Sequence, residues 1–342
     1  MHKIRLVLIA LCILAPAIAQ GDFEDGIAAL HEFRPLAEKG DARAQNGMGI
    51  LCMEGRAVPK NVAAAILWFR KSAEQNYAGA QLNLGLAYAR GSDVARNDAA
   101  AAGWYFKAAE QGQVEAQYKL GAAYATGTGV ARNDAQAVKW FRLAAEQGHV
   151  LAQHDLGNHY LMGKGVARDE AEAAKWYRMA AEQDNAPSQF NLAQMYVSGR
   201  GVIRSEAAAA RWYRKAAEQG DAEAQFSLGV LYQDGRGVPR DYAQALQWYR
   251  KSAQQGDRDA QNNLALMYAQ GTGVAKDERE AVKWYRLAAE QGSAQAEHNL
   301  GLMYLNGRGV AKNVAEAKKW LSKAAEQGHA GARESLRKLS AR

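Results

Sequence analysis

The chain has 342 residues, a formal net charge of +7, 48% hydrophobic residues and 23% charged residues. This composition is typical of a folded protein and argues against a disordered chain. Beyond the N-terminus no apolar run approaches the ~18 residues that a membrane-spanning helix needs.

The N-terminus has the pattern of a secretory signal peptide. Lys3 and Arg5 supply positive charge, Leu6–Ala15 is an apolar run too short to span a membrane, and an Ala-Ile-Ala triplet ends at Ala19. We therefore expect cleavage after Ala19 and a periplasmic or secreted protein. Removal of residues 1–19 takes away two positive charges and leaves +5. This mild excess gives no indication of a nucleic-acid partner.

Only one cysteine remains after the expected cleavage. Cys12 lies in the signal peptide, so Cys52 has no intramolecular disulfide partner. A retained membrane anchor and lipidation at Cys12 are the alternatives to cleavage. Cys52 falls in a core column of the repeat described next, which predicts a buried filler. The alternative is an intermolecular disulfide or a reactive thiol.

The sequence repeats itself every 36 residues, and this repeat determines the expected fold. Around each tryptophan the sequence reads roughly A-x-A-x-x-W-[YF]-R-x-A-A-E-Q-G, and a G-x-G-V connector closes most units. The regular spacing predicts that the tryptophans form a structural core column. The tryptophans are Trp68, Trp104, Trp140, Trp176, Trp212, Trp248, Trp284 and Trp320.

Each unit is predicted to form two helices. Apolar residues at three- and four-residue spacing around Trp140 indicate an amphipathic first helix. Asp, Asn or Ser starts this helix, as at Asp241, and a glycine such as Gly220 follows its end. A second helix begins about nine residues after the tryptophan. The sequence therefore predicts an all-α solenoid of about nine helix-turn-helix hairpins.

The two ends of the array depart from the consensus. Residues 20–60 form a degenerate N-terminal capping repeat, in which Pro35 is expected to bend or shorten the first helix. Residues 61–312 form seven repeats, and residues 313–342 form a C-terminal capping repeat with a charged last helix. Such ends are what a solenoid needs to terminate an apolar stack.

The pattern A-A-E-Q-G … A-x-A-Q-x-x-L-G-x-x-Y-x-x-G-x-G-V resembles the Sel-one-like repeat, a relative of the tetratricopeptide repeat, over nearly all of residues 22–342. The resemblance implies a right-handed α-solenoid with a concave inner face, and an adaptor that brings proteins together. Together with the signal peptide, it points to bacterial periplasmic or secreted members. A cysteine-rich branch of the family is linked to β-lactam hydrolysis, but this chain lacks the cysteine pairs of that branch.

No motif for catalysis is found, so we expect no enzyme activity and no cofactor. His154 and His159 are five residues apart, which does not place them on one helix face, and we expect no metal site. Arginines stand two residues after most tryptophans, with a glutamate four residues further on. Arg214 and Glu218 are one such pair. We expect i,i+4 ion pairs that neutralise this arginine column.

The residues most exposed on the first helices are the candidates for binding a partner. They vary between units and lie opposite the apolar stripe. The candidates are Lys139, Leu143, Lys175, Met179, Arg211, Lys215 and Lys283. By resemblance to tetratricopeptide arrays, first helices line the concave groove, and cations beside Leu and Met suit an acidic or amphipathic segment.

The sequence therefore predicts a non-catalytic protein–protein interaction scaffold of the bacterial envelope or of the secreted fraction. Its partner is a protein, and after signal cleavage nothing in the chain indicates a membrane span. A protein that binds cell-wall glycan or exopolysaccharide is the alternative. A second and less favoured alternative is a β-lactamase-like hydrolase, as in the cysteine-rich branch.

Overall fold

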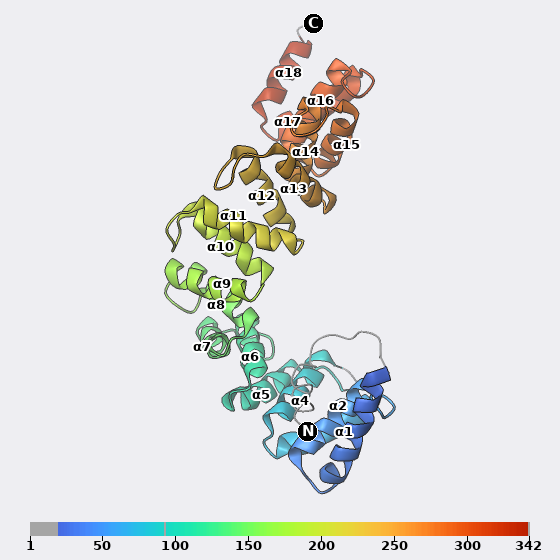
Figure 1. Cartoon of the computed structure of the whole chain (residues 1–342), viewed down its shortest axis with the longest axis vertical. Helices are drawn as coiled ribbons and strands as arrows, with labels where there is room; N and C mark the ends of the chain where they lie inside the picture. Colours follow the sequence, from blue (N-terminus) through green and yellow to red (C-terminus); the bar gives the residue numbers. More distant parts are fainter. Residues whose placement is uncertain (1–19, 92–93, 341–342) are drawn as a thin grey trace. The chain divides into compact units, whose positions relative to one another are not determined.

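The structure is a computed structural model that describes residues 20–91 and 94–340. The expected signal peptide and Cys12 lie outside these residues. Every regular element in the described ranges is an α-helix, and the helices form nine consecutive pairs (Figure 1). We call the odd-numbered helices first helices and the even-numbered ones second helices. No described helix is long and apolar enough to cross a membrane.

The helices are α1 (Gln20–Glu38), α2 (Ala42–Glu54), α3 (Val62–Glu74), α4 (Ala78–Arg90), α5 (Asp98–Glu110), α6 (Val114–Thr126), α7 (Asp134–Glu146), α8 (Val150–Met162), α9 (Glu170–Glu182), α10 (Ala186–Ser198), α11 (Glu206–Glu218), α12 (Ala222–Asp234), α13 (Tyr242–Gln254), α14 (Arg258–Gln270), α15 (Glu278–Glu290), α16 (Ala294–Asn306), α17 (Val314–Glu326) and α18 (Ala330–Ser340).

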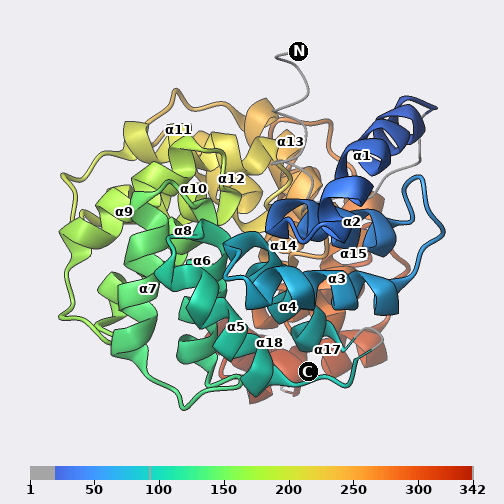
Figure 2. The same cartoon turned by 90° about the horizontal axis from the view of Figure 1, so that it is seen from below.

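The chain divides into two compact units, one ending at Ala152 and the other beginning at Gln153. Within each unit a first helix packs against the second helix of its own pair, and that second helix packs against the first helix of the next pair. Figure 2 shows the hairpins of each unit following one another in chain order. Tandem packing of this kind confirms the predicted α-solenoid.

The predicted helix ends are confirmed. Asp241 is extended and its side chain accepts a hydrogen bond from the backbone N–H of Gln244, which starts α13. After α11 the chain turns through Gly220, whose φ of +97° suits glycine. The expected shortening at Pro35 is wrong, because α1 continues to Glu38. Phe33 and Ala37 on either side of Pro35 are buried, and their packing holds the last turn.

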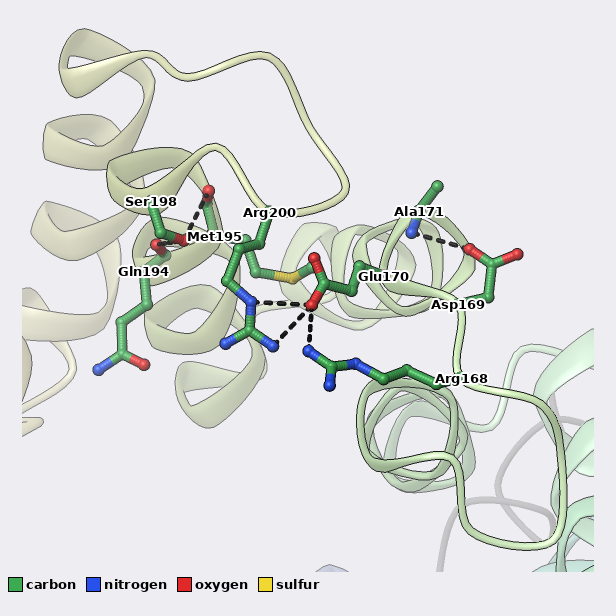
Figure 3. Close-up of polar contacts among 8 residues, drawn as sticks. All are labelled: Arg168, Asp169, Glu170, Ala171, Gln194, Met195, Ser198 and Arg200. Carbon is green, nitrogen blue, oxygen red and sulfur yellow. Dashed lines mark hydrogen bonds and ion pairs between the residues drawn. The ribbon is translucent and has the colours of Figure 1, made fainter.

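The G-x-G-V connector returns to the start of the first helix of its own hairpin. At Gly237, with φ of +68°, a Cβ atom would overlap the carbonyl group of Glu206, so only glycine fits. Figure 3 shows the equivalent region one repeat earlier. There Arg168 and Arg200 both donate to the Glu170 carboxylate, at 2.6 and 2.8 Å. These hydrogen bonds hold the pKa of Glu170 below its usual range.

Aromatic rings fill the space between hairpins. The residue after each tryptophan lies against a glycine or alanine of the preceding second helix, as Tyr249 lies against Gly229. A Cβ atom at Gly229 would come within 2.7 Å of the Tyr249 ring. Tyr177 and Tyr249 are fully buried. Burial raises the pKa of both phenols.

The tryptophan column lies beside these rings. Trp140, Trp176, Trp248 and Trp320 are buried, and the other four are partly buried. Trp248 belongs to the apolar cluster that includes Leu228 and Leu231 of the preceding hairpin. Phe226 of α12 packs forward in the same way, since its ring contacts the Tyr249 ring at a centroid distance of 5.8 Å.

Buried glutamines join successive hairpins through side-chain hydrogen bonds. Gln291 donates to Gln261 at 2.9 Å, and Gln261 in turn donates to the carbonyl of Ala253 at 3.2 Å. The same glutamine–glutamine hydrogen bond joins the end of each first helix from α3 to α15 to the preceding second helix. The donor–acceptor pairs are Gln75–Gln45, Gln111–Gln81, Gln147–Gln117, Gln183–Gln153, Gln219–Gln189, Gln255–Gln225 and Gln291–Gln261.

We call this series of bonds the glutamine ladder. Its last step, between α17 and α16, has a carboxyl group in place of the accepting amide. Gln327 donates to Glu297 at 2.8 Å, and Glu297 is only 3% exposed. An ionised carboxylate accepts this bond but has no proton to donate to a backbone carbonyl, as Gln261 does. Burial raises the pKa of Glu297, and the hydrogen bond from Gln327 partly opposes this shift.

Removal of a buried tryptophan ring should destabilise the second unit. We expect Trp176→Ala, at a site only 7% exposed, to lower the free energy of unfolding by ~3–5 kcal/mol because the lost ring leaves a cavity. Helical content at low temperature should remain. Urea denaturation followed by circular dichroism measures the loss, with exposed Gln247→Ala as the control. Equal midpoints for the two variants would contradict this packing.

Replacement of the buried carboxyl group should stabilise the second unit. We expect Glu297→Gln to raise the free energy of unfolding at pH 7 by roughly 1–2 kcal/mol, since the amide restores the missing donor. Because the folded pKa of Glu297 lies above the ordinary value of 4.5, the native protein itself gains stability as the pH falls through that pKa. The advantage of the variant should therefore shrink towards pH 4.5.

Urea midpoints at pH 7 and pH 5 test this dependence. Glu290→Gln is the control, because it removes an equal charge from an exposed position of the same unit. If Glu297→Gln raised the free energy of unfolding by the same amount at both pH values, the charge of Glu297 would not be the cause of the gain.

Candidate binding surface on the first helices

The structure places the candidate residues on the first helices of both units. Lys139 and Leu143 lie on α7 of the first unit, and the others lie in the second unit. Those of the second unit are Lys175 and Met179 on α9, Arg211 and Lys215 on α11, and Lys283 on α15. All are exposed except Met179, which is half-buried.

Several lysines of this surface lie over the tryptophan rings. Lys215 Nζ is 5.1 Å from the centroid of the Trp212 ring, and Lys251 Nζ is 4.2 Å from that of Trp248. Lys175 lies over Trp176 in the same way and also pairs with Glu172. A lysine lies over each of these tryptophan rings, and the same holds at Trp68, Trp104, Trp140 and Trp320. They do not form bare aromatic platforms of the kind that glycan binding favours.

The arginine column is not neutralised as expected. No ion pair joins Arg214 to Glu218 in the described part of the chain, and the Arg214 guanidinium donates instead to the Tyr232 hydroxyl. The same bond recurs at a separation of 18 residues in four other repeats. The pairs are Arg70–Tyr88, Arg178–Tyr196, Arg250–Tyr268 and Arg286–Tyr304.

The reason is the order of the two charges. An arginine placed N-terminal to a glutamate at i,i+4 has the weaker of the two orientations, and even a good pair contributes only ~0.2–0.5 kcal/mol on an exposed helix. The Tyr232 ring, by contrast, packs against the apolar clusters of its hairpin, so its hydroxyl is fixed. The guanidinium is thus held in place and keeps its charge.

Positive charge is concentrated on α11 and α13. Helix α11 contains two acidic residues, Glu206 and Glu218, and two arginines neutralise Glu206. Helix α13 contains no acidic residue. The position of Glu218 is occupied by Gln254 in the next repeat. The two helices together carry five cations, which are Arg211, Arg214, Lys215, Arg250 and Lys251.

A pocket of about 510 Å³ opens between these two helices. It is lined from α11 by Arg214 and Glu218, from the end of α12 by Tyr232, and from α13 by Gln244 and Trp248. Its rim is the connector segment Pro239, Arg240 and Asp241.

One polar atom in the lining of this pocket has no hydrogen-bond partner. Trp248 is buried, and its indole Nε1 has no acceptor in the described chain. One repeat later the equivalent Trp284 Nε1 donates to Glu280 Oε1 at 3.0 Å. Glu280 stands four residues before Trp284, and Gln244 stands four residues before Trp248. Within the described residues the indole N–H is also unpartnered at Trp140 and at Trp176, although Glu172 stands four residues before Trp176, so a carboxylate at this position does not by itself supply the acceptor.

The remaining reactive side chains are engaged in structure. Cys52 is buried, and burial raises the pKa of its thiol. His154 Nδ1 lies 2.8 Å from the Ser188 hydroxyl, and His159 Nδ1 lies 2.8 Å from the carbonyl oxygen of Lys164. Across the described ranges, no group of three His, Cys, Asp or Glu side chains is arranged to hold a metal ion.

Comparison with known families gives a direct match to this repeat. The Sel1 repeat model matches eight consecutive segments, which are residues 42–77, 78–113, 114–149, 150–185, 186–221, 222–257, 258–293 and 294–329. The chain belongs to the Sel1 repeat family. The resemblance seen in the sequence is thus confirmed. Sel1 repeat proteins are generally non-catalytic scaffolds for protein interactions.

Solved structures of Sel1 repeat proteins are similar to this chain. One is c5321, described as a protective antigen present in uropathogenic Escherichia coli strains, with 43% identity and a TM-score of 0.86 over 90% of this chain. This chain spans 66% of that protein, just under two thirds. A Sel1 repeat protein from Oxalobacter formigenes has 32% identity and a TM-score of 0.67, and the match covers 98% of this chain and 100% of that one. The search of curated proteins found no match.

Proposed function

We propose that this Sel1 repeat protein is a non-catalytic scaffold that binds a partner protein through the exposed faces of its first helices. The observation that carries the proposal is the α11–α13 surface, where five cations stand beside one unpaired glutamate. Arg214 and Arg250 are oriented by tyrosine hydroxyls and carry no ion pair of their own in the described chain. A surface of oriented, uncompensated cations suits an acidic or amphipathic segment.

We also propose that the protein acts in the bacterial envelope or after secretion. The support is the basic, apolar and small-residue pattern of residues 1–19. The description of c5321 as a protective antigen is compatible with export. Multiple weak contacts along a repeat array would supply the affinity, with a few buried anchors dominating it.

A site-specific photo-crosslink tests the binding surface. A photoreactive residue placed at Arg211, on the exposed face of α11, should give a discrete protein adduct in the cells that produce the protein. Mass spectrometry then identifies the partner. The matched control carries the same residue at Gln194, an exposed position of the second helix α10.

An adduct from position 211 and none from position 194 is the expected outcome. Equal adducts from both positions, or none from either, would contradict the first-helix surface. In the latter case purified cell-wall glycan is the next ligand to assay. Turnover of a chromogenic β-lactam by the purified mature protein would contradict the non-catalytic proposal.

A further inference from the structure

Two second helices of the array begin at a histidine. The Nδ1 atom of His149 accepts from the backbone N–H of Ala152 at 3.1 Å and caps α8, and that of His329 accepts from Ala332 at 3.2 Å and caps α18. A neutral imidazole can accept in this way, but a protonated imidazole has no lone pair left at Nδ1. Protonation therefore removes either cap.

The surroundings of His149 compensate for such a charge. Its Nε2 lies 3.0 Å from a carboxylate oxygen of Glu115, and its ring stacks on the ring of Tyr118 at a centroid distance of 4.4 Å. The hydrogen bond with His149 holds the pKa of Glu115 below its usual range, so the carboxylate stays ionised beside the histidine. An imidazolium at this place gains an ion pair when it loses the cap.

The surroundings of His329 offer no such compensation. Its Nε2 lies 3.2 Å from the amide oxygen of Gln295, and its ring stacks on a second imidazole, that of His298, at a centroid distance of 4.5 Å. Gln295 and His298 stand five repeats after Glu115 and Tyr118. The last hairpin therefore has a neutral amide in place of the carboxylate and a titratable ring in place of the phenol.

The other charged groups at this end do not replace the missing carboxylate. The acids Glu334 and Glu297 are both engaged, since Glu334 pairs with Arg337 and Lys338 of its own helix and Glu297 accepts from Gln327. The charged residues of α16 and of the turns that join α17 to α18 are Glu297, Lys323, Glu326, Arg333 and Glu334. In the described chain no carboxylate is hydrogen-bonded to either histidine of the stack.

Helix α18 lies directly against the two rings. A Cβ atom at Gly331, in its first turn, would lie 3.3 Å from Nε2 of His298. A positive charge is unfavourable there because the N-terminus of a helix carries a partial positive charge of its own. Burial, and to a smaller extent His329, hold the pKa of His298 below its ordinary value of 6.5. The apolar cluster under α18 is small, with Leu321, Ala324 and Ala332 as its buried members.

We propose that the stacked pair His298 and His329 is a pH-sensitive switch that holds α18 on the end of the array when neutral and releases it when protonated. Above about pH 7 the cap forms and α18 covers Leu321; below about pH 6 the cap is lost and positive charge gathers at the helix N-terminus. Because the docked state disfavours protons at His298, its stability is lost as the pH falls from 6.5. The switch goes beyond the proposed scaffold function and does not depend on the first-helix surface.

Hydrogen exchange measured by mass spectrometry at pH 7.5 and pH 5.5, with times corrected for the intrinsic rate, tests the switch locally. A local measurement is needed because Glu297 stabilises the fold as the pH falls and so acts in the opposite sense. We expect the protection of residues 330–340 to fall at least about fivefold at pH 5.5, as the loss of an N-cap implies. Residues 150–162 of α8 should change less than about twofold.

Two sets of substitutions assign the effect to the pair. Gln295→Glu combined with His298→Tyr copies the surroundings of His149, and His329→Ser copies the serine cap that Ser293 provides for α16. Each should keep α18 protected at both pH values. Glu297→Gln is the control, because it removes a neighbouring titratable group, and the fall should remain. Equal protection of α18 at both pH values in the native protein, or a fall that persists in both sets, would overturn the proposal.

Discussion

The packing of one aromatic ring on one small residue is the contact on which the rest of each unit depends. Except at Trp320, which Leu321 follows, the ring after each tryptophan lies against a glycine or alanine of the preceding second helix, with no space for a larger side chain at Gly229 or Gly157. This close approach brings the two helices together and sets the distance between hairpins. Because the contact recurs at every step, any insertion in a helix would displace the next ring from its partner. The constant 36-residue spacing follows from this requirement.

The same geometry places the polar side chains. With the rings fixed, each Gln of the A-E-Q-G segment lies within hydrogen-bonding distance of a glutamine on the preceding second helix, as in Gln291–Gln261, or of Glu297 in the case of Gln327. Five of the arginines two positions after a tryptophan donate to a tyrosine at the end of their own hairpin, as Arg214 does to Tyr232. The connectors return to the first helix because glycine permits the approach of Gly237 to Glu206. Buried amides are satisfied by these bonds, which removes the cost of burying them.

The helices, their caps and the interleaved aromatic columns could be predicted from the sequence because each is a local or periodic property. The arginine–tyrosine bonds could not, because they join residues 18 apart whose meeting depends on how two helices pack. The expected partner of each arginine, the glutamate four residues further on, is near in sequence but poorly oriented for an ion pair. Helix α1 also continues past Pro35, since the burial of Phe33 and Ala37 outweighs a local preference for ending there, so the shortening was wrongly expected while a bend stays a prediction. The glutamine ladder was missed, although a Gln at both positions of nearly every repeat was a visible signal.

In a chain of near-identical repeats, the departures from the consensus carry the information about function. Sequence comparison between repeats shows that Gln244 stands where the next repeat has Glu280, and that Gln254 stands where its neighbours have glutamate. The position of Gln244 varies along the array, with alanine at Ala208 and glutamine at Gln136, whereas the position of Gln254 holds glutamate in the other tryptophan-containing units. The absence of glutamate at Gln254 leaves α13 without an acidic residue, and Gln254 lies at the end of that helix, outside the pocket that Gln244 borders. The loss of this otherwise constant glutamate raises the positive charge of the first-helix surface, and the requirements of the scaffold do not explain it, because the flanking repeats fold with Glu218 and Glu290 in place.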